Sequence, residues 1–240
     1  MELPKKLKKS TILETVTEFR FKNRLEIEDV FFIVKSKLDE KGYKYTKTPL
    51  LEIPPAIREG DQNLKYATYY IFQKGKYLVN VSPQKISFSN KGFYNGWKDY
   101  FTFIVEIYES LGSLFEKWEF DRLSMRYINF FNEIDIFENI NIKIEMPEIL
   151  SKKNENSKSY SSEIKMNDNI TLKLQVINNL SLRNEENKVS IGSIVDTDVF
   201  LDANVKDYEK SLNILHDTTK EIFFNILKPE FIEKLEPEYK

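Results

Sequence analysis

The chain has 240 residues, of which 41% are hydrophobic and 14% aromatic, a composition typical of a folded protein and not of a disordered one. It has no cysteine, which excludes disulfides, thiolate metal sites and cysteine nucleophiles. Its apolar clusters, such as residues 30–34, are too short to span a bilayer, and no apolar segment follows the basic start to form a secretory signal. We therefore expect a soluble, cytoplasmic protein without a membrane partner.

Charge is unevenly distributed along the chain. Residues 1–100 hold 19 Lys and Arg against 12 Asp and Glu, whereas residues 101–240 hold 17 against 26. This pattern indicates either a nucleic-acid surface on the basic half or attraction between the two halves, within one molecule or between copies. The second interpretation is favoured, because a nearly neutral chain is a poor starting point for phosphate binding.

In the first half, alternating polarity predicts a strand over 11–21, and 3.6-residue periodicity predicts a helix over 26–41 that Gly42 ends. The three prolines in residues 47–60 predict a loop. A meander of strands is predicted over 66–73, 76–82 and 85–90, followed by a helix over 97–115 and a strand over 120–131. The residues expected to face the core are Val30, Phe31, Val34 and Leu38 in the first helix and Phe101, Ile104, Val105, Tyr108 and Leu111 in the second.

The second half repeats this order after a polar, low-complexity segment, residues 148–162, that predicts a linker or exposed loop. Strands are expected over 160–166, 170–183 and 188–202, then a helix over 206–227 and a short helix that starts at Pro229. The predicted fold is α+β with two similar units, 1–147 and 163–240, each an antiparallel β-meander followed by a long helix. Internal duplication and chance recurrence of a common arrangement both explain this order.

Several segments carry a resemblance to a known family. They are Ile12–Phe21 (ILETVTEFRF), Trp97 at the start of the middle helix, Arg122–Asn129 (RLSMRYIN), Asp196–Phe200 (DTDVF) and the pair Leu215-His216. In this order they resemble a sporadically distributed family of uncharacterised prokaryotic proteins of similar length. The resemblance covers essentially the whole chain, with Thr15 where alanine is usual and Ser10-Thr11 where prolines are usual. It implies no mechanism, but patchy distribution is typical of accessory genes, including defence genes.

The first candidate site is a ligand pocket on the strand that carries Arg122 and Arg126. Glu14 and Glu18 share one face of the first strand, and Arg122 and Arg126 share one face of theirs. If these strands are neighbours, the side chains, together with Asn129, form either a pocket for an anionic ligand or a structural network of ion pairs. The structural interpretation is favoured.

Two further candidates involve acidic residues and histidine. Asp196, Asp198 and Asp202 share one face of a predicted strand. Clustered carboxylates can bind Mg²⁺ or Mn²⁺, and acidic residues on a solvated strand face also keep a sheet soluble. The second interpretation is favoured, and no metal is expected. His216 is the sole histidine, and its neighbour Asp217 is expected to point about 100° away around the helix. We therefore expect a partly buried structural histidine.

A nucleic-acid surface is the last candidate. Lys74, Lys76, Lys85 and Lys91 interleave with aromatic residues on the predicted meander, as a stacking platform requires. Aromatic residues are also favoured in strands for core packing, and this interpretation is preferred. The aromatic residues concerned are Tyr69, Tyr70, Phe72, Tyr77, Phe88, Phe93 and Tyr94.

No serine-nucleophile elbow, dinucleotide fingerprint or phosphate loop occurs in the sequence, so we expect no cofactor and favour a protein that is not an enzyme. The leading hypothesis is an accessory or regulatory module that binds another protein or a second copy of itself. The alternatives are a nucleic-acid-binding factor that uses the basic half, and a small anionic ligand binder or enzyme at the junction of the two units.

Overall fold

A computed structural model describes residues 3–22, 25–61, 64–115, 118–144, 157–167, 169–183, 187–202 and 207–239. The chain divides into two compact units that do not follow a single cut in the sequence. Unit 1 comprises Met1–Leu13, Arg126–Val199 and His216–Lys240, and unit 2 comprises Glu14–Met125 and Phe200–Leu215.

The described strands form an antiparallel sheet in the order β3-β4-β5-β6-β2-β7-β10-β9-β8, and a separate pair, β1 with β11. The expected α+β class is confirmed. The strands are β1 (Lys6–Leu7), β2 (Ile12–Lys22), β3 (Lys44–Lys47), β4 (Tyr70–Lys74), β5 (Tyr77–Ser82), β6 (Lys85–Lys91), β7 (Glu119–Asn132), β8 (Ser159–Lys165), β9 (Ile170–Arg183), β10 (Val189–Asp202) and β11 (Pro237–Glu238).

The described helices agree with the expected long helices and add short ones. The long ones are α1 (Ile27–Glu40), α3 (Trp97–Ser110) and α6 (Tyr208–Ile226), and the short ones are α2 (Pro55–Gly60), α4 (Gly112–Phe115), α7 (Pro229–Lys234) and the 3₁₀ turns η1 (Pro49–Glu52), η2 (Leu64–Tyr66) and η3 (Ile136–Glu138). None of these helices is long and apolar enough to cross a membrane.

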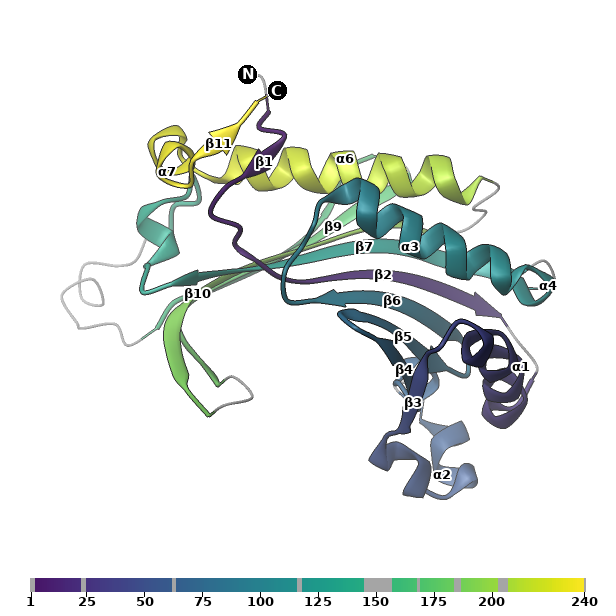
Figure 1. Ribbon diagram of the computed structural model, residues 1–240. Coiled ribbons are helices and arrows are strands. Elements are labelled where there is room, and N and C mark those ends of the chain that lie inside the picture. Colours follow the sequence, from purple (N-terminus) through teal and green to yellow (C-terminus); the bar gives the residue numbers. More distant parts are fainter. Residues whose placement is uncertain are drawn as a thin grey trace. The chain divides into compact units, whose positions relative to one another are not determined.

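In unit 2, helices α1 and α3 cover one face of the sheet. Phe31 of α1 stacks on Tyr70 of β4 with 4.0 Å between ring centroids, and Phe103 of α3 stacks on Tyr77 of β5 at 4.2 Å. Figure 1 shows α3 running along β2 and β6. Strand β2 turns its odd-numbered residues toward this core, so that Phe19 is fully buried. The alternation expected for this strand is confirmed.

Two details of unit 2 correct the sequence prediction. Residues 47–60 do not form a plain loop, because Pro49 and Pro55 each occupy the first position of a short helix, where a proline needs no amide hydrogen. In α3, the buried residues include Tyr100, Phe103 and Ile107, whereas Phe101, Val105 and Tyr108 are only half-buried. The buried stripe is therefore rotated by about one residue from the predicted one.

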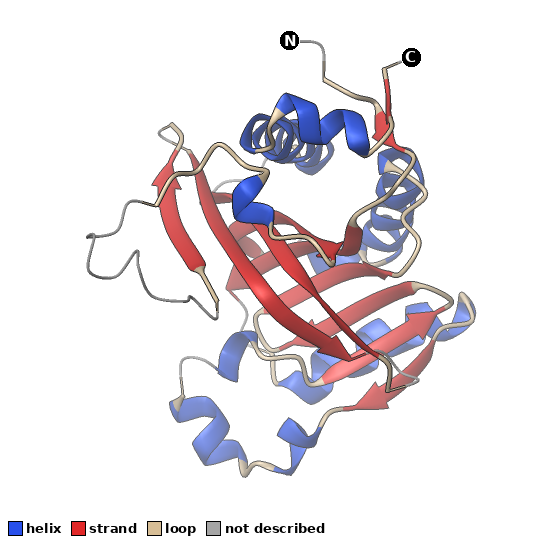
Figure 2. Ribbon diagram, turned by 90° about the vertical axis from the view of Figure 1, so that its left-hand side faces the viewer, coloured by secondary structure: helices blue, strands red, loops and turns tan. Residues whose placement is uncertain are grey.

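Unit 1 has its own core. The ring of Phe131 on β7 lies 5.6 Å from that of Phe231 on α7, and Val176, Val195 and Val199 are fully buried. Gly192 of β10 is required by close packing, because a Cβ atom there would lie 2.2 Å from the carbonyl oxygen of Phe131. Near the two ends of the chain β1 pairs with β11 (Figure 2).

The expected linker, 148–162, lies only partly within the described residues. Residues 148–156 fall outside them, and the remaining part leads into β8, which begins at Ser159. The proposed division of the chain into 1–147 and 163–240 stays a prediction.

Candidate functional site

The face of unit 2 that is opposite to α1 and α3 is polar. Pairing of β2 with β6 places Glu18 opposite Ser87, and pairing of β5 with β6 places Asn80 opposite Ser87 as well. Directly opposed residues in antiparallel strands point to the same side of the sheet. We use the name polar face for this surface. Its polar residues are Asn80 and Ser82 of β5, Lys85, Ser87 and Ser89 of β6, Glu14, Glu18 and Arg20 of β2, and Arg122 and Ser124 of β7, and the apolar residues Val16, Ile71 and Leu78 lie on the same side.

Arg122 and Ser124 belong to this face because of the alternation of β7. Thr17, which points to the helix-covered side, donates a hydrogen bond to the sulfur of Met125 at 3.3 Å, so Met125 points there too. Within unit 2, Arg122 and Ser124 of β7 therefore point to the polar face. The guanidinium carbon of Arg122 lies 3.4 Å from the ring centroid of Phe200, a cation–π contact.

The serines of the polar face lie deep. Ser87 is 3% exposed and Ser89 is 2% exposed. Both accept a hydrogen bond from the amide nitrogen of Asn80, with Nδ2–Oγ distances of 3.3 Å. Small hydroxyl side chains thus form the floor of this face, between longer charged side chains.

A partly buried ion triad stands beside these serines. One carboxylate oxygen of Glu18 accepts from Arg20 Nε at 2.5 Å, and the other lies 3.2 Å from Lys85 Nζ. The side chains of Glu18 and Lys85 are each 14% exposed. Burial raises the pKa of Glu18, but Lys85 and Arg20 outweigh this effect and hold that pKa below its ordinary value. The carboxylate is therefore ionised at neutral pH.

The 3₁₀ turn η2 borders the triad. The guanidinium of Arg20 lies 4.4 Å from the ring centroid of Tyr66, and Ser82 donates its hydroxyl hydrogen to the carbonyl oxygen of Tyr66 at 3.3 Å. These contacts position Arg20, whose side chain remains 28% exposed. Within the triad, two cations share one largely buried carboxylate.

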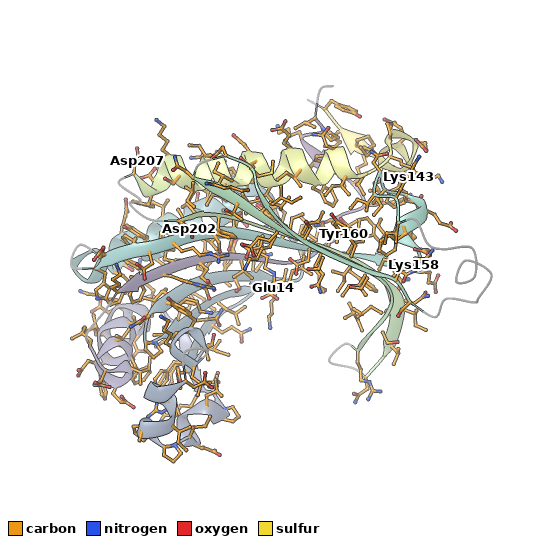
Figure 3. The ribbon with its side chains drawn as sticks, turned by 180° about the vertical axis from the view of Figure 1, so that it is seen from behind. Glu14, Lys143, Lys158, Tyr160, Asp202 and Asp207 are labelled. Atoms are coloured by element: carbon orange, nitrogen blue, oxygen red, sulfur yellow. The ribbon has the colours of Figure 1, made fainter. Side chains whose placement is uncertain are left out.

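The structure brings only part of the predicted ligand pocket together. Glu14, Glu18 and Arg122 belong to the polar face of unit 2; Figure 3 labels Glu14, which lies opposite Lys91 in the pairing of β2 with β6. Arg126 lies in unit 1, where Asp196 binds it through two hydrogen bonds. Asn129 also lies in unit 1, is 2% exposed and accepts a hydrogen bond from Thr11 Oγ1 at 2.8 Å.

The acidic strand β10 places its aspartates in different surroundings. Asp196 is 7% exposed and pairs with Arg126, whereas Asp202 is exposed at the end of β10 (Figure 3). Within the described ranges, no group of three or more acidic or histidine side chains is arranged to hold a metal ion.

His216 is largely buried, with a side chain that is 15% exposed. Its Nδ1 lies 3.0 Å from Asp217 Oδ1, so the two neighbours touch, contrary to the expected separation around the helix. The short aspartate side chain reaches back to the ring of the preceding residue. Burial lowers the pKa of His216, and Asp217 offsets part of this effect.

The predicted nucleic-acid lysines lie in four different places. Lys74 donates to the carbonyl oxygen of Lys41 at 2.9 Å, Lys76 pairs with Asp99 at 3.0 Å, and Lys85 belongs to the ion triad. Lys91 is exposed at the end of β6. Of the aromatic residues expected to interleave with them, Tyr69, Tyr70, Phe72 and Phe88 are buried in the core, whereas Phe93 is 76% exposed.

Sequence reasoning missed Asn80, Ser82, Ser87 and Ser89 as parts of a site. A signal was present in β6, where Lys85, Ser87 and Ser89 alternate with the apolar residues Ile86 and Phe88. A polar stripe on a strand whose other face is apolar indicates a two-sided sheet.

Comparison with protein-family models gives no match for this chain, and comparison with curated proteins gives none either. The resemblance to a prokaryotic family therefore stays a prediction, and the functional argument depends on the geometry of the polar face.

Proposed function

We propose that the protein binds a small anionic ligand on the polar face of unit 2. The observation that carries this proposal is the combination of a hydroxyl-lined floor with two cations, Arg20 and Lys85, that share the single, largely buried carboxylate of Glu18. Charged groups are costly to remove from water unless a partner compensates them. Glu18 compensates part of this charge, and an anionic ligand would compensate the rest.

The shape of the floor supports this proposal. Ser87 and Ser89 have among the smallest polar side chains. Ser87 lies directly opposite Glu18 and two residues from Lys85 on the same strand face. A ligand that binds over Ser87 would therefore lie beside a hydroxyl group and the two cations of the triad. Such convergence of a few polar groups is typical of small-molecule sites.

A purely structural role is the competing interpretation of the ion triad. In that case Glu18, Arg20 and Lys85 fix the register of β2 and β6, and no ligand is required. The two interpretations differ in one respect: a ligand site predicts that added anions stabilise the folded protein, because they bind the folded state and not the unfolded chain.

The experiment measures the Tm of the protein in increasing inorganic phosphate, sulfate and citrate, with sodium chloride at matched ionic strength. We expect a saturable rise in Tm with at least one of these anions, and a smaller rise for Lys85→Met. Lys74→Met is the matched control, because Lys74 contacts only a backbone carbonyl among its described hydrogen bonds. Equal responses to all salts, or equal responses of the two variants, would reject the ligand site.

A second candidate function is protein–protein interaction, as an accessory or regulatory module. The observation that favours it is a set of exposed apolar residues on the outer strands of unit 1. Val189 and Ile191 at the start of β10 are 54% and 56% exposed, and Ile164 and Met166 beside the β8–β9 turn are 39% and 46% exposed. Exposed apolar groups of this kind occur at interaction surfaces. Light scattering on the protein and on Ile191→Ser tests self-association: a dimer that Ile191→Ser disrupts supports this function, and a monomer excludes a partner copy.

The nucleic-acid alternative has support from Lys91 and the exposed ring of Phe93 alone among the predicted residues. A salt-sensitive gel shift with a single-stranded oligonucleotide tests it, and the absence of a shift at low salt removes it.

We also propose that the chain arose by internal duplication and acts in the cytoplasm. The strand order supports duplication: β4, β5 and β6 precede α3 and end beside β2, while β8, β9 and β10 precede α6 and end beside β7. The absence of cysteine fits a reducing compartment. If the duplication is real, homologous chains will show detectable sequence similarity between these two segments.

A further inference from the structure

The loop that leads from β6 into α3 contains the only Asn-Gly pair in the sequence, Asn95-Gly96. Asparagine is chemically labile, because the backbone nitrogen of the following residue attacks its side-chain carbonyl carbon. A side chain on that following residue hinders the attack, so a glycine there permits the fastest reaction. The sequence therefore makes Asn95 the most reactive asparagine of the chain, provided that the fold leaves it accessible.

The fold leaves both residues of this pair accessible. Asn95 is exposed, and Asn95 and Gly96 lie outside helices and strands. Gly96 directly precedes α3 with a φ of 103°, a conformation that favours glycine. Among the described residues, its backbone N–H donates to no backbone carbonyl oxygen, so no such bond holds the nitrogen that would attack.

We propose that Asn95 is a site of spontaneous deamidation in the folded protein. A bond forms between the backbone nitrogen of Gly96 and the side-chain carbonyl carbon of Asn95, and the bond from that carbon to Nδ2 breaks. The amide proton of Gly96 goes to hydroxide, water returns a proton to Nδ2, and ammonia leaves. Water then opens the resulting succinimide ring at either carbonyl carbon, which gives aspartate or isoaspartate. Water is the only co-reactant, and nothing is oxidised or reduced.

The product adds a negative charge near Asp99, which lies in the first turn of α3. Asp99 Oδ2 lies 3.0 Å from Lys76 Nζ and also accepts from the hydroxyl of Tyr77. The hydrogen bond from Tyr77 is the main reason why the pKa of Asp99 is below its ordinary value, and Asn95 supplies a further hydrogen bond. Deamidation replaces the donor amide of Asn95 by a carboxylate, which only accepts and repels Asp99. The reaction therefore weakens the contacts at the start of α3.

The experiment incubates the full chain at mildly acidic and at mildly alkaline pH and follows its peptides by chromatography and mass spectrometry, which separate asparagine, aspartate and isoaspartate. Asn213 is the internal control, because it is exposed but is followed by Ile214 within α6. We expect Asn95 to convert at least about tenfold faster than Asn213, which corresponds to a barrier lower by about 1.4 kcal/mol. The rate should rise with pH, because the attacking nitrogen must lose its proton.

Two results would overturn the proposal. One is conversion of Asn95 in the urea-unfolded chain but not in the folded protein, which would show that the loop holds the nitrogen of Gly96 away from the side chain. The other is conversion of Asn95 and Asn213 at equal rates. Asn95→Gln is the matched variant, because its longer side chain forms the corresponding ring far more slowly while it keeps an amide; the change at this peptide should be lost in it.

The consequence for α3 is tested by the Tm of Asn95→Asp and Asn95→Gln. We expect Asn95→Asp to melt at a lower temperature than Asn95→Gln at low ionic strength, because the new carboxylate repels Asp99. The difference should shrink in concentrated salt, which screens this repulsion. Equal Tm values at low ionic strength would show that the charge gained on deamidation does not weaken the start of α3.

Discussion

Arg126 and Asp196 form a two-point ion pair within unit 1. Arg126 Nε lies 2.8 Å from Asp196 Oδ1, and Nη2 lies 2.5 Å from Oδ2. The side chain of Asp196 is 9% exposed and that of Arg126 is 44% exposed. This geometry is the strong, bidentate form of an arginine–carboxylate contact. It links a residue predicted to bind a ligand to one considered for a metal, and gives both a structural role.

The Arg126–Asp196 pair predicts a specific loss of stability. Arg126→Met leaves a largely buried carboxylate without its guanidinium partner, so we expect the free energy of unfolding to fall by about 2 kcal/mol. Urea denaturation measures this change. Lys173→Met is the control, because Lys173 and Glu163 form an ion pair in which both side chains are about half exposed, and such pairs contribute less than about 1 kcal/mol. Similar losses in the two variants would contradict the structural role of Arg126.

The ion triad predicts an acid-sensitive contribution from Glu18. Because the pKa of Glu18 is held below its ordinary value of about 4.3, its contribution is present above that pH and is lost as the pH falls through the lowered pKa. We expect Glu18→Gln to be less stable than the wild-type protein at pH 7, and the difference to shrink as the pH falls below the ordinary pKa of about 4.3. Urea unfolding at pH 7 and pH 3.5 tests this. A difference that is the same at both pH values would show that the charge of Glu18 is not what stabilises the triad.

The sole histidine predicts a second pH effect, at higher pH. Burial lowers the pKa of His216, so the folded protein binds fewer protons than the unfolded chain just below the ordinary pKa of about 6.5. Its neutral form favours folding above that pH, and this contribution declines as the pH falls. We expect the wild-type protein to lose stability from pH 7.5 to pH 5.5, and His216→Gln to lose less. Equal losses in the two proteins would place the titrating group elsewhere.

We expect an apolar substitution of Asn90 to raise the free energy of unfolding. It is 1% exposed, and neither its amide nitrogen nor its amide oxygen has a hydrogen-bond partner among the described residues. Replacing such a group by an apolar one of similar shape removes the cost of its desolvation, so we expect Asn90→Leu to raise the free energy of unfolding by about 1 kcal/mol. Asn129→Leu is the matched control, because Asn129 is also buried but accepts from Thr11; it should lower stability. A loss in Asn90→Leu would show that this amide has a partner, such as a bound water molecule.

The local elements were largely predictable from sequence. Alternation in Ile12–Phe21 predicted β2 and the face on which Glu18 lies, and the periodicity of Val30, Phe31, Val34 and Leu38 predicted the buried side of α1. Both signals are local, because burial on one side of an element repeats with its own period. The predicted buried stripe of α3 differs from the observed one by about one residue. The helix carries aromatic residues at adjacent positions, so composition alone does not distinguish buried Tyr100 from half-buried Phe101.

The polar face was not predictable as a site, although the sequence shows the polar residues of each strand. Which side chains of β5, β6 and β2 oppose one another depends on strand register, and no local pattern states that Asn80, Ser87 and Glu18 share a row. The sequence shows Lys85 only as one of four lysines on the predicted meander, because its contact with Glu18 depends on strand register. The same limit explains why Arg126 was assigned to Glu14 and Glu18 and not to Asp196, a residue 70 positions away in the sequence.

The most direct measurement of the central claim is a calorimetric titration of inorganic phosphate into the wild-type protein and into Lys85→Met at low ionic strength. The polar face predicts saturable binding to the wild-type protein, at least tenfold weaker binding to Lys85→Met, and unchanged binding to Lys74→Met. Saturable binding that Lys85→Met leaves unchanged, or no binding of phosphate, sulfate or citrate to the wild-type protein, would contradict it.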